Sequence, residues 1–216
     1  FDCSKLDNTK NLQEIASDIL NVYHRQERPE LNVSQPFKRN FNKKYVCIAT
    51  QSTSQFKYWN NSTGWKQTVD YLKTIGYDVV CIDKQECFGT DKKMNCIPKG
   101  CINKTGDLPL QERMNDLYFC DFFIGLTSGL SWLAWSLEKP VVLISGISKD
   151  HVEFATPYRV TNTNVCHACA TEKGFEFDKA DWMFCPKNKN FECTSSITFE
   201  MVKEKIDKLI KDNNLK

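Results

Sequence analysis

Short apolar runs alternate with amphipathic segments through the middle of the chain. The apolar runs, each short enough for one buried strand, are 45–49 (YVCIA), 78–82 (DVVCI), 122–125 (FFIG) and 140–145 (PVVLIS). Apolar residues at helical spacing separate or follow these runs, over 63–74, 108–117 and 130–137. This order predicts an α/β fold with a doubly wound parallel sheet. Sheets of this kind bind their ligands at the carboxyl ends of the strands.

The pattern divides the chain into four parts. We expect an entry helix and linker over 1–40, a Rossmann-like α/β domain over 41–165, a metal knuckle over 166–195 and a C-terminal helix over 196–216. The first helix has apolar positions at i, i+3, i+4 and i+7 from Leu12 to Val22. Between Asp83 and Lys104 the pattern predicts only a loop that includes a short strand at most.

Composition narrows the classes of partner. The 216 residues include 29 Lys and Arg against 27 Asp and Glu, a net charge of +2, which gives no electrostatic reason to expect a nucleic acid. The longest nearly apolar stretch, 129–147, contains Glu138, Lys139 and Pro140, so we expect no membrane span. The chain begins with Phe1 and has no basic-then-apolar leader, which favours a fragment or a processed chain.

Four of the eleven cysteines form a pattern that is typical of a metal site. Cys166, Cys169, Cys185 and Cys193 follow the spacing C-x2-C-x15-C-x7-C. A C-x2-C turn directs two sulfurs to one side, and a second pair returned by a loop completes a tetrahedral shell. Zinc and a single iron ion both accept four thiolates, so spacing alone leaves the metal open. Cys47 and Cys81 lie inside apolar runs, where cysteine behaves as a small buried hydrophobe.

Other uses of these cysteines are weaker. Two disulfides in a secreted domain would agree with the N-x-S/T sequons, which are Asn32, Asn60, Asn61 and Asn103. Unpaired cysteines in core strands instead favour a reducing compartment. His167 could compete as a ligand, although four sulfurs are already available. A redox role for the CHAC sequence is the weakest reading, because thioredoxin-type motifs have no second pair downstream.

Two polar loops follow strands of the predicted sheet and could bind a phosphate. The first contains Gln51, Ser52, Thr53 and Lys57, and the second contains Thr127, Ser128, Gly129 and Leu130. Hydroxyls, a lysine and the free N–H groups of a helix N-terminus are all phosphate ligands. The alternatives are a solvated turn and an ordinary N-cap. Neither loop matches a Walker or G-x-G-x-x-G fingerprint. For Trp132 and Trp135, which follow the second loop, core packing is favoured over stacking on an acceptor.

Two longer stretches resemble a known family. TQSTSQFKYWNN with the following GWKQTVDYLKTIGYDVVCI is similar to the start of the nucleotide-sugar half of bacterial heptosyltransferases. NKTGDLPLQERMNDLYFCDFFIGLTSGLSWLAWSLEKPVVLISG resembles a later segment of the same family. Thr127, Trp132 and the four cysteines depart from the lipopolysaccharide enzymes and resemble the autotransporter heptosyltransferases. The implied fold is a Rossmann-like half of a GT-B glycosyltransferase.

The resemblance implies a function and a set of ligands. Those enzymes transfer heptose from ADP-heptose to hydroxyl side chains of autotransporter adhesins in the bacterial cytoplasm, and four cysteines hold iron (Fe3+). The resemblance implies that Lys57 neutralises the donor diphosphate, which docks at Thr127, Ser128 and Gly129. It also implies hydrogen bonds to phosphate or sugar from Gln51, Ser52 and Thr53. The general base is expected on the other half of the enzyme, outside this chain. A homo-oligomer is left open, as is zinc in place of iron.

Two other functions compete with this reading. One is a lipopolysaccharide-type heptosyltransferase, which Thr127, Trp132 and the cysteine pattern disfavour. The other is a non-catalytic interaction module, in which a metal knuckle is carried by a Rossmann-like body. Loss of Lys57 would leave the function of such a module intact, whereas loss of Cys166 would abolish it.

Overall fold

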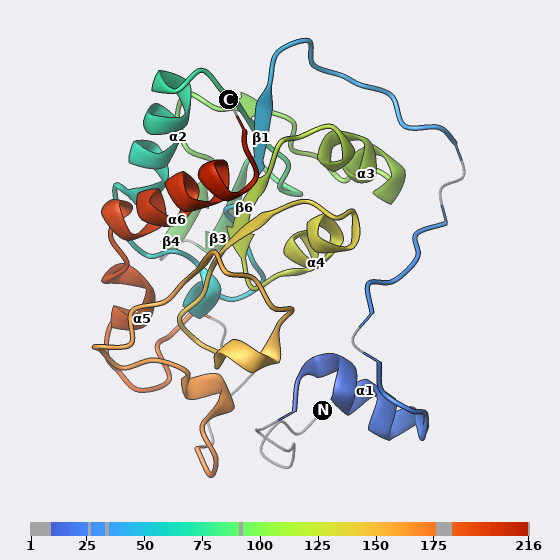
Figure 1. The fold of residues 1–216 in the computed structure, drawn as a ribbon. Helices are drawn as coiled ribbons and strands as arrows, with labels where there is room; N and C mark the ends of the chain where they lie inside the picture. Colours follow the sequence, from blue (N-terminus) through green and yellow to red (C-terminus); the bar gives the residue numbers. More distant parts are fainter. Residues whose placement is uncertain (1–9, 26, 33–34, 91–92, 176–182, 216) are drawn as a thin grey trace.

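A six-stranded sheet in which every strand pair is parallel forms the centre of the protein (Figure 1). The structure, a computed structural model, describes residues 10–25, 27–32, 35–90, 93–175 and 183–215. The strand order is β5-β2-β1-β6-β7-β8. Their bounds are β1 Tyr45–Ile48, β2 Asp78–Cys81, β5 Ile102–Asn103, β6 Phe123–Leu126, β7 Val141–Ile144 and β8 Arg159–Val160. From β1 the chain adds β2 and β5 on one side, and it then adds β6, β7 and β8 on the other side. This reversal of strand order confirms the predicted doubly wound sheet.

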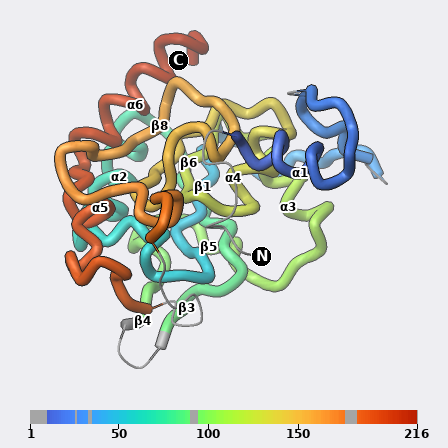
Figure 2. The backbone as a smooth tube through the Cα atoms, turned by 90° about the horizontal axis from the view of Figure 1, so that it is seen from below, coloured from blue at the N-terminus to red at the C-terminus, as the bar shows by residue number. Residues whose placement is uncertain are grey.

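Helices cover both faces of this sheet. Helices α2 (Gly64–Thr74) and α6 (Phe199–Asp212) lie together on one face, and α3 (Leu110–Tyr118) and α4 (Gly129–Ser136) lie on the other. The view from below separates the same two layers (Figure 2). Parallel strands that are covered on both sides need apolar residues at successive positions. The short continuous runs in the sequence therefore correspond to the strands of the sheet.

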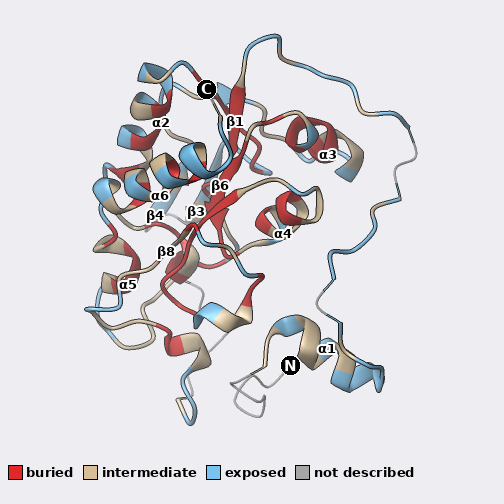
Figure 3. Cartoon of the chain, in the orientation of Figure 1, coloured by how far each residue is buried: buried red, intermediate tan, exposed pale blue. Residues whose placement is uncertain are grey.

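Successive residues of one strand serve two different cores. Val46 and Ile48 of β1 pack with α2 and α6, whereas Tyr45 and Cys47 pack with α3 and α4. All four are fully buried, as is most of the sheet (Figure 3). Each large apolar side chain removed from water contributes about 1.5–3 kcal/mol. The predicted burial of Cys47 and Cys81 is confirmed, and both are free thiols.

The ends of several elements differ from the predicted ranges by one to three residues. The strand expected over 122–125 is β6, Phe123–Leu126, because its limits follow its pairing with β7. The C-terminal helix expected from 196 begins at Phe199, since the Thr198 side chain accepts a hydrogen bond from the Met201 N–H at 3.4 Å. A separate short helix, α5 (Glu192–Ser195), precedes it. Side-chain caps and strand partners, which apolar periodicity does not record, set these boundaries.

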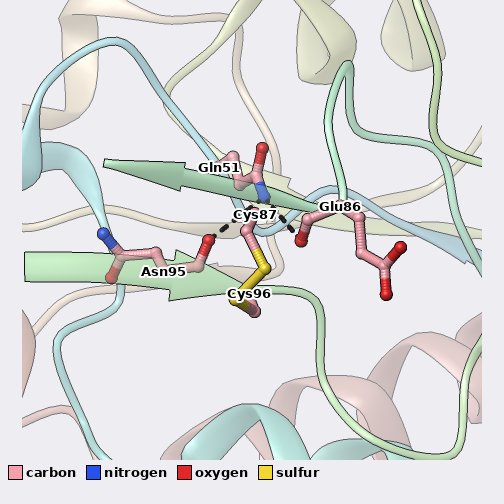
Figure 4. The surroundings of a disulfide bond; sticks show 5 residues. All are labelled: Gln51, Glu86, Cys87, Asn95 and Cys96. Carbon is pink, nitrogen blue, oxygen red and sulfur yellow. Dashed lines mark hydrogen bonds between the residues drawn. A yellow bond between two sulfur atoms is a disulfide. The ribbon is translucent and has the colours of Figure 1, made fainter. Parts of the chain in front are cut away.

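An antiparallel hairpin occupies part of the segment 83–104, for which the sequence pattern predicted a loop with a short strand at most. Strands β3 (Cys87–Thr90) and β4 (Lys93–Cys96) pair with each other, outside the main sheet. Cys87 and Cys96 face each other in the register and form a disulfide, with 4.0 Å between their Cα atoms (Figure 4). This pair was not predicted, because the spacing of Cys87 and Cys96 does not distinguish them from the other nine cysteines.

The N-terminal helix α1 (Leu12–Leu20) lies on the side of α3 and α4. It begins with a capping box between Asn11 and Glu14, ends before Asn21 in the left-handed conformation, and contains no buried residue. Farther along the chain, Phe37 stacks on Tyr118 of α3 with 4.2 Å between ring centroids. Across the ranges given above, no helix is both long and apolar enough to cross a membrane.

The cysteine-containing segment docks at the carboxyl end of β7. Ala168 donates its N–H to the Gly146 carbonyl at 2.8 Å, and Ala170 donates to the Ile147 carbonyl at 3.0 Å. A small apolar cluster, made of Phe56, Ile147, Phe191 and Cys193, seals the contact. The segment is therefore part of the folded body and contacts the loop that follows β1.

Gly146 is required for this docking, and its replacement gives a test. A Cβ atom there would lie 2.6 Å from the Cys193 carbonyl oxygen and 2.8 Å from the Thr194 methyl group. Backbone atoms cannot move aside cheaply, so Gly146→Ala should lower the free energy of unfolding by about 1–3 kcal/mol. Gly129→Ala is the control, since no atom lies within 4 Å of its added Cβ. Equal melting temperatures for the two variants would contradict this account.

Candidate nucleotide-sugar site

The β1–α2 loop begins at the carboxyl end of β1 and is anchored by a buried acid. Both oxygens of Asp83, which follows β2, accept hydrogen bonds from the loop: Thr50 donates its N–H at 2.8 Å and its hydroxyl at 2.9 Å, and Gln51 donates its N–H at 3.1 Å. Burial raises the pKa of Asp83, and the bonds from Thr50 and Gln51 oppose that rise. The direction of the loop is thus fixed at its first two residues.

The loop is also tied to the β3–β4 hairpin. The Gln51 side chain donates to the main-chain carbonyls of Glu86 and Asn95, at 3.3 and 3.4 Å (Figure 4). Asn95 in turn donates to the Gln55 side chain at 2.8 Å. The hairpin that the sequence did not predict therefore forms one wall beside the predicted loop.

The β6–α4 turn supplies a helix N-terminus beside this loop. Ser128 is the N-cap of α4 in an extended conformation, and its side chain makes no capping hydrogen bond. Its hydroxyl oxygen is buried and has no hydrogen-bond partner among the residues that the structure describes. A buried polar atom without a partner is costly in a folded protein. The open hydroxyl and the positive end of α4 are suited to an anion.

These two loops enclose a first cavity of about 490 Å³. Six of the eight predicted binding residues line it, three from each loop: Gln51, Ser52, Thr53, Ser128, Gly129 and Leu130. The remaining lining residues were not among those predicted from the sequence; they are Asp83, Lys84, Gln85, Phe88, Leu110 and Leu133. Asp83 could have been found, because it directly follows an apolar run. Phe88 carries no such signal, since its place depends on the hairpin.

The other two predicted residues line a second cavity of about 260 Å³. Lys57 and Thr127 border it together with Trp132, His151 and Glu153. Thr127 and Ser128 are consecutive, so both cavities border the β6–α4 turn. Trp135 is buried, as predicted, whereas the partly buried Trp132 packs on Phe154 and also faces this cavity.

Two charged residues that line the second cavity, Glu153 and Lys57, differ in whether they form an ion pair with another described residue. Glu153 is buried and accepts a hydrogen bond from the Ser148 hydroxyl at 2.7 Å, and Arg159 pairs with its other oxygen at 2.5 Å. Lys57, at the end of the short helix η2 (Gln55–Lys57), forms no salt bridge within the described ranges. A lysine free of protein carboxylates remains available to an anionic ligand.

The four cysteines of the predicted metal knuckle are all free thiols in one neighbourhood. Cys169 and Cys193 are buried, and Cys166 and Cys185 are partly buried. Burial, followed by the charges of the neighbouring cysteines, raises the pKa of Cys169 to about 11 and that of Cys193 to about 12. Lys189 donates its N–H to the Cys185 sulfur at 3.3 Å. Among the described residues, no group of three or more His, Cys, Asp or Glu is arranged to hold a metal ion.

The donor chemistry of these cysteines nevertheless suits a thiophilic metal. The four unpaired sulfurs come from two stretches of chain, Cys166 and Cys169 from one and Cys185 and Cys193 from the other. A cation would offset the repulsion that opposes their deprotonation. The four free thiols thus have the donor chemistry of a four-thiolate site, and the described residues do not show them arranged around a metal ion.

Comparison with known proteins places the chain in a family. The model of glycosyltransferase family 9 (heptosyltransferase) matches residues 8–184. The autotransporter heptosyltransferase TibC of Escherichia coli O78:H11 is 49% identical over 198 residues, which are 90% of this chain and 48% of TibC. The chain therefore spans about half the length of this curated relative.

Solved structures agree with this assignment. The crystal structure of the iron-containing dodecameric glycosyltransferase TibC from enterotoxigenic E. coli H10407 is 46% identical, with a TM-score of 0.89 over 95% of this chain and 54% of that chain. The structure of TibC in complex with ADP-D-beta-D-heptose is 45% identical, covers the same shares of the two chains, and has a TM-score of 0.90. From the fold, the loops at the strand ends and these matches, the chain belongs to glycosyltransferase family 9, the heptosyltransferase family.

Proposed function

We propose that this chain binds ADP-heptose and is the donor-binding part of an enzyme that transfers heptose to Ser or Thr hydroxyls of an autotransporter adhesin. One observation carries the proposal: two loops that are far apart in the sequence line one cavity where the strand order reverses. Doubly wound sheets bind nucleotides at this point. The match to a TibC structure that contains ADP-D-beta-D-heptose supports this choice of ligand.

The composition of the first cavity suits the nucleoside. Phe88, Leu110 and Leu133 provide apolar surface for the faces of a planar base. Gln51, Ser52 and Thr53 present amide and hydroxyl groups that can hydrogen-bond to ribose and phosphate oxygens. We place the heptose in the second cavity, which also borders the β6–α4 turn.

The diphosphate would lie at the turn between the two cavities. There it meets the Ser128 hydroxyl, the N-terminus of α4 and the Lys57 ammonium group. In the transfer step the acceptor oxygen forms a bond to the anomeric carbon, the bond from that carbon to the diphosphate oxygen breaks, and the acceptor hydroxyl proton passes to the general base expected on the other half of the enzyme. Negative charge grows on the departing ADP, and donors already in place lower the barrier by stabilising it.

Lys57→Ala tests the placement of the diphosphate. A charge-assisted hydrogen bond contributes about 1.5–3 kcal/mol, so the variant should bind ADP and ADP-heptose about tenfold to a hundredfold more weakly. Lys66→Ala is the matched control, because Lys66 pairs with Asp70 on the exposed side of α2. Isothermal titration calorimetry measures the affinities. Unchanged binding by the Lys57 variant would contradict the placement.

Gly129→Ala tests whether the nucleotide approaches this residue, because the substitution should weaken ligand binding without lowering protein stability. Its Cβ would meet no protein atom within 4 Å, so the melting temperature should stay within about 2 °C of wild type. Because Gly129 lines the first cavity, the added methyl group would occupy space that the bound nucleotide needs. We expect weaker ADP binding by about threefold or more. Binding equal to that of wild type would show that the nucleotide does not approach this residue.

We further propose that Cys166, Cys169, Cys185 and Cys193 hold an iron ion with a structural role. Iron is supported by the iron-containing TibC structure and by the set of four free sulfurs. The bound ion would supply folding free energy to a segment that contains few large apolar residues. That segment contacts the β1–α2 loop, because Asn60 donates to the Thr194 hydroxyl at 2.9 Å. Just after the segment, the Ile197 carbonyl accepts a hydrogen bond from Trp59 at 2.9 Å.

Metal analysis and visible absorption test the iron site. Purified protein should contain about one iron per chain and absorb visible light, and Cys166→Ser should lose both properties. Cys101→Ser is the control, since Cys101 lies outside the four-cysteine set. A colourless protein with bound zinc would contradict iron but keep the site. A metal-free protein with an intact fold would contradict the site itself.

The place of the reaction and the assembly follow from the same proposal. We place the transfer in the bacterial cytoplasm, as the family resemblance implies, and propose a homo-oligomer, because TibC is dodecameric. The competing function, a non-catalytic metal-knuckle module, predicts that no ADP-sugar binds to folded, metal-loaded protein. Calorimetry with ADP-heptose therefore distinguishes the two functions.

A further inference from the structure

We propose that Asp83 is a positioning residue for the donor: its buried carboxylate fixes the β1–α2 loop in the orientation that binds the nucleotide sugar. The inference rests on the proposed function, since it concerns the same cavity. Asp83 lies at the carboxyl end of the sheet, directly beyond β2, and its side chain is almost entirely buried. It acts on the ligand through the loop.

Three hydrogen bonds from two consecutive residues converge on this carboxylate. One oxygen accepts the N–H and the hydroxyl of Thr50, and the other oxygen accepts the N–H of Gln51, all within 3.1 Å. With these N–H groups directed inward, the chain turns so that Gln51, Ser52 and Thr53 line the first cavity. The residues proposed to contact the donor thus follow directly from the anchored pair.

A carboxylate is the group that this arrangement needs. The two backbone N–H groups meet different oxygens of Asp83, and each oxygen of a carboxylate is an acceptor. An asparagine has only one acceptor oxygen, so its NH2 group would face one of the loop N–H groups. The Cys81 thiol adds a further donor at 3.2 Å. Replacement of Asp83 by asparagine therefore removes one of the two acceptor oxygens while preserving the side-chain volume.

The backbone of Asp83 is held from the opposite side by Arg113. This buried guanidinium, on α3, donates to the carbonyl oxygens of Asp83 at 3.1 Å, Gly106 at 2.6 Å and Lys104 at 2.7 Å. The carboxylate consequently extends from a fixed point. Ligand-contacting groups need such a support to keep their geometry.

Amide hydrogen exchange and calorimetry with ADP test the role of Asp83 in the full 216-residue chain. In Asp83→Asn, the amides of Thr50 and Gln51 should exchange about tenfold faster, and ADP should bind about tenfold more weakly. Asp207→Asn is the control: this carboxylate, on α6, accepts hydrogen bonds from Tyr71 and Lys203 and contacts neither Asp83 nor Arg113. It should lower stability and leave both readouts close to wild type.

A second variant covers the case in which Asp83→Asn does not fold. Thr50→Val removes only the hydroxyl bond to Asp83 and should weaken ADP binding about threefold. If the wild-type chain binds ADP, either of two results for Asp83→Asn would overturn the inference and leave the proposed function standing. One is slow exchange at both amides, and the other is wild-type affinity for ADP. Wild-type protein that binds no ADP would overturn the proposed function, and the inference with it.

Discussion

The parallel pairing of β1 with β6 determines where the rest of the site can lie. Cys47 and Ile48 are in register with Phe123 and Ile124, so both strands end at the same edge of the sheet. The chain leaves these neighbouring strands toward opposite faces, since α2 covers one face and α4 the other. The two departing loops therefore diverge, and the space between them is the first cavity. A register shift here would separate the two halves of the site.

The β1–α2 loop depends on supports from three directions. Asp83 holds its first residues, and the β3–β4 hairpin holds Gln51. Two bonds hold its far end: Asn60 donates to Thr194 of the cysteine segment, and Trp59 donates to Ile197, which follows that segment. Phe56, in the middle of the loop, packs on Cys193. A loop with few backbone partners of its own can keep a defined shape only through such contacts. This arrangement connects the state of the cysteine segment to the geometry of the nucleotide-sugar site.

Most of the sheet could be predicted from the sequence, because strands that are buried on both faces leave continuous apolar runs such as VVCI and VVLI. The two loops could be located for the same reason, since each directly follows a run. The hairpin at 87–96 could not be predicted, because its apolar residues Phe88 and Met94 are exposed and its strands are joined by their mutual pairing and a disulfide, which leave no apolar run. The two-residue strands β5 and β8 leave no pattern either.

By itself, the sequence determined the order of strands and helices, the two polar loops and the four-cysteine spacing, because each is a local pattern of side chains. Only the tertiary structure decided that Gln51 and Ser128 line one cavity while Lys57 and Thr127 line the next. It also decided that Asp83 anchors the first loop. These relations join residues that are about 30 to 80 positions apart, and they depend on strand order and register, which no local pattern encodes.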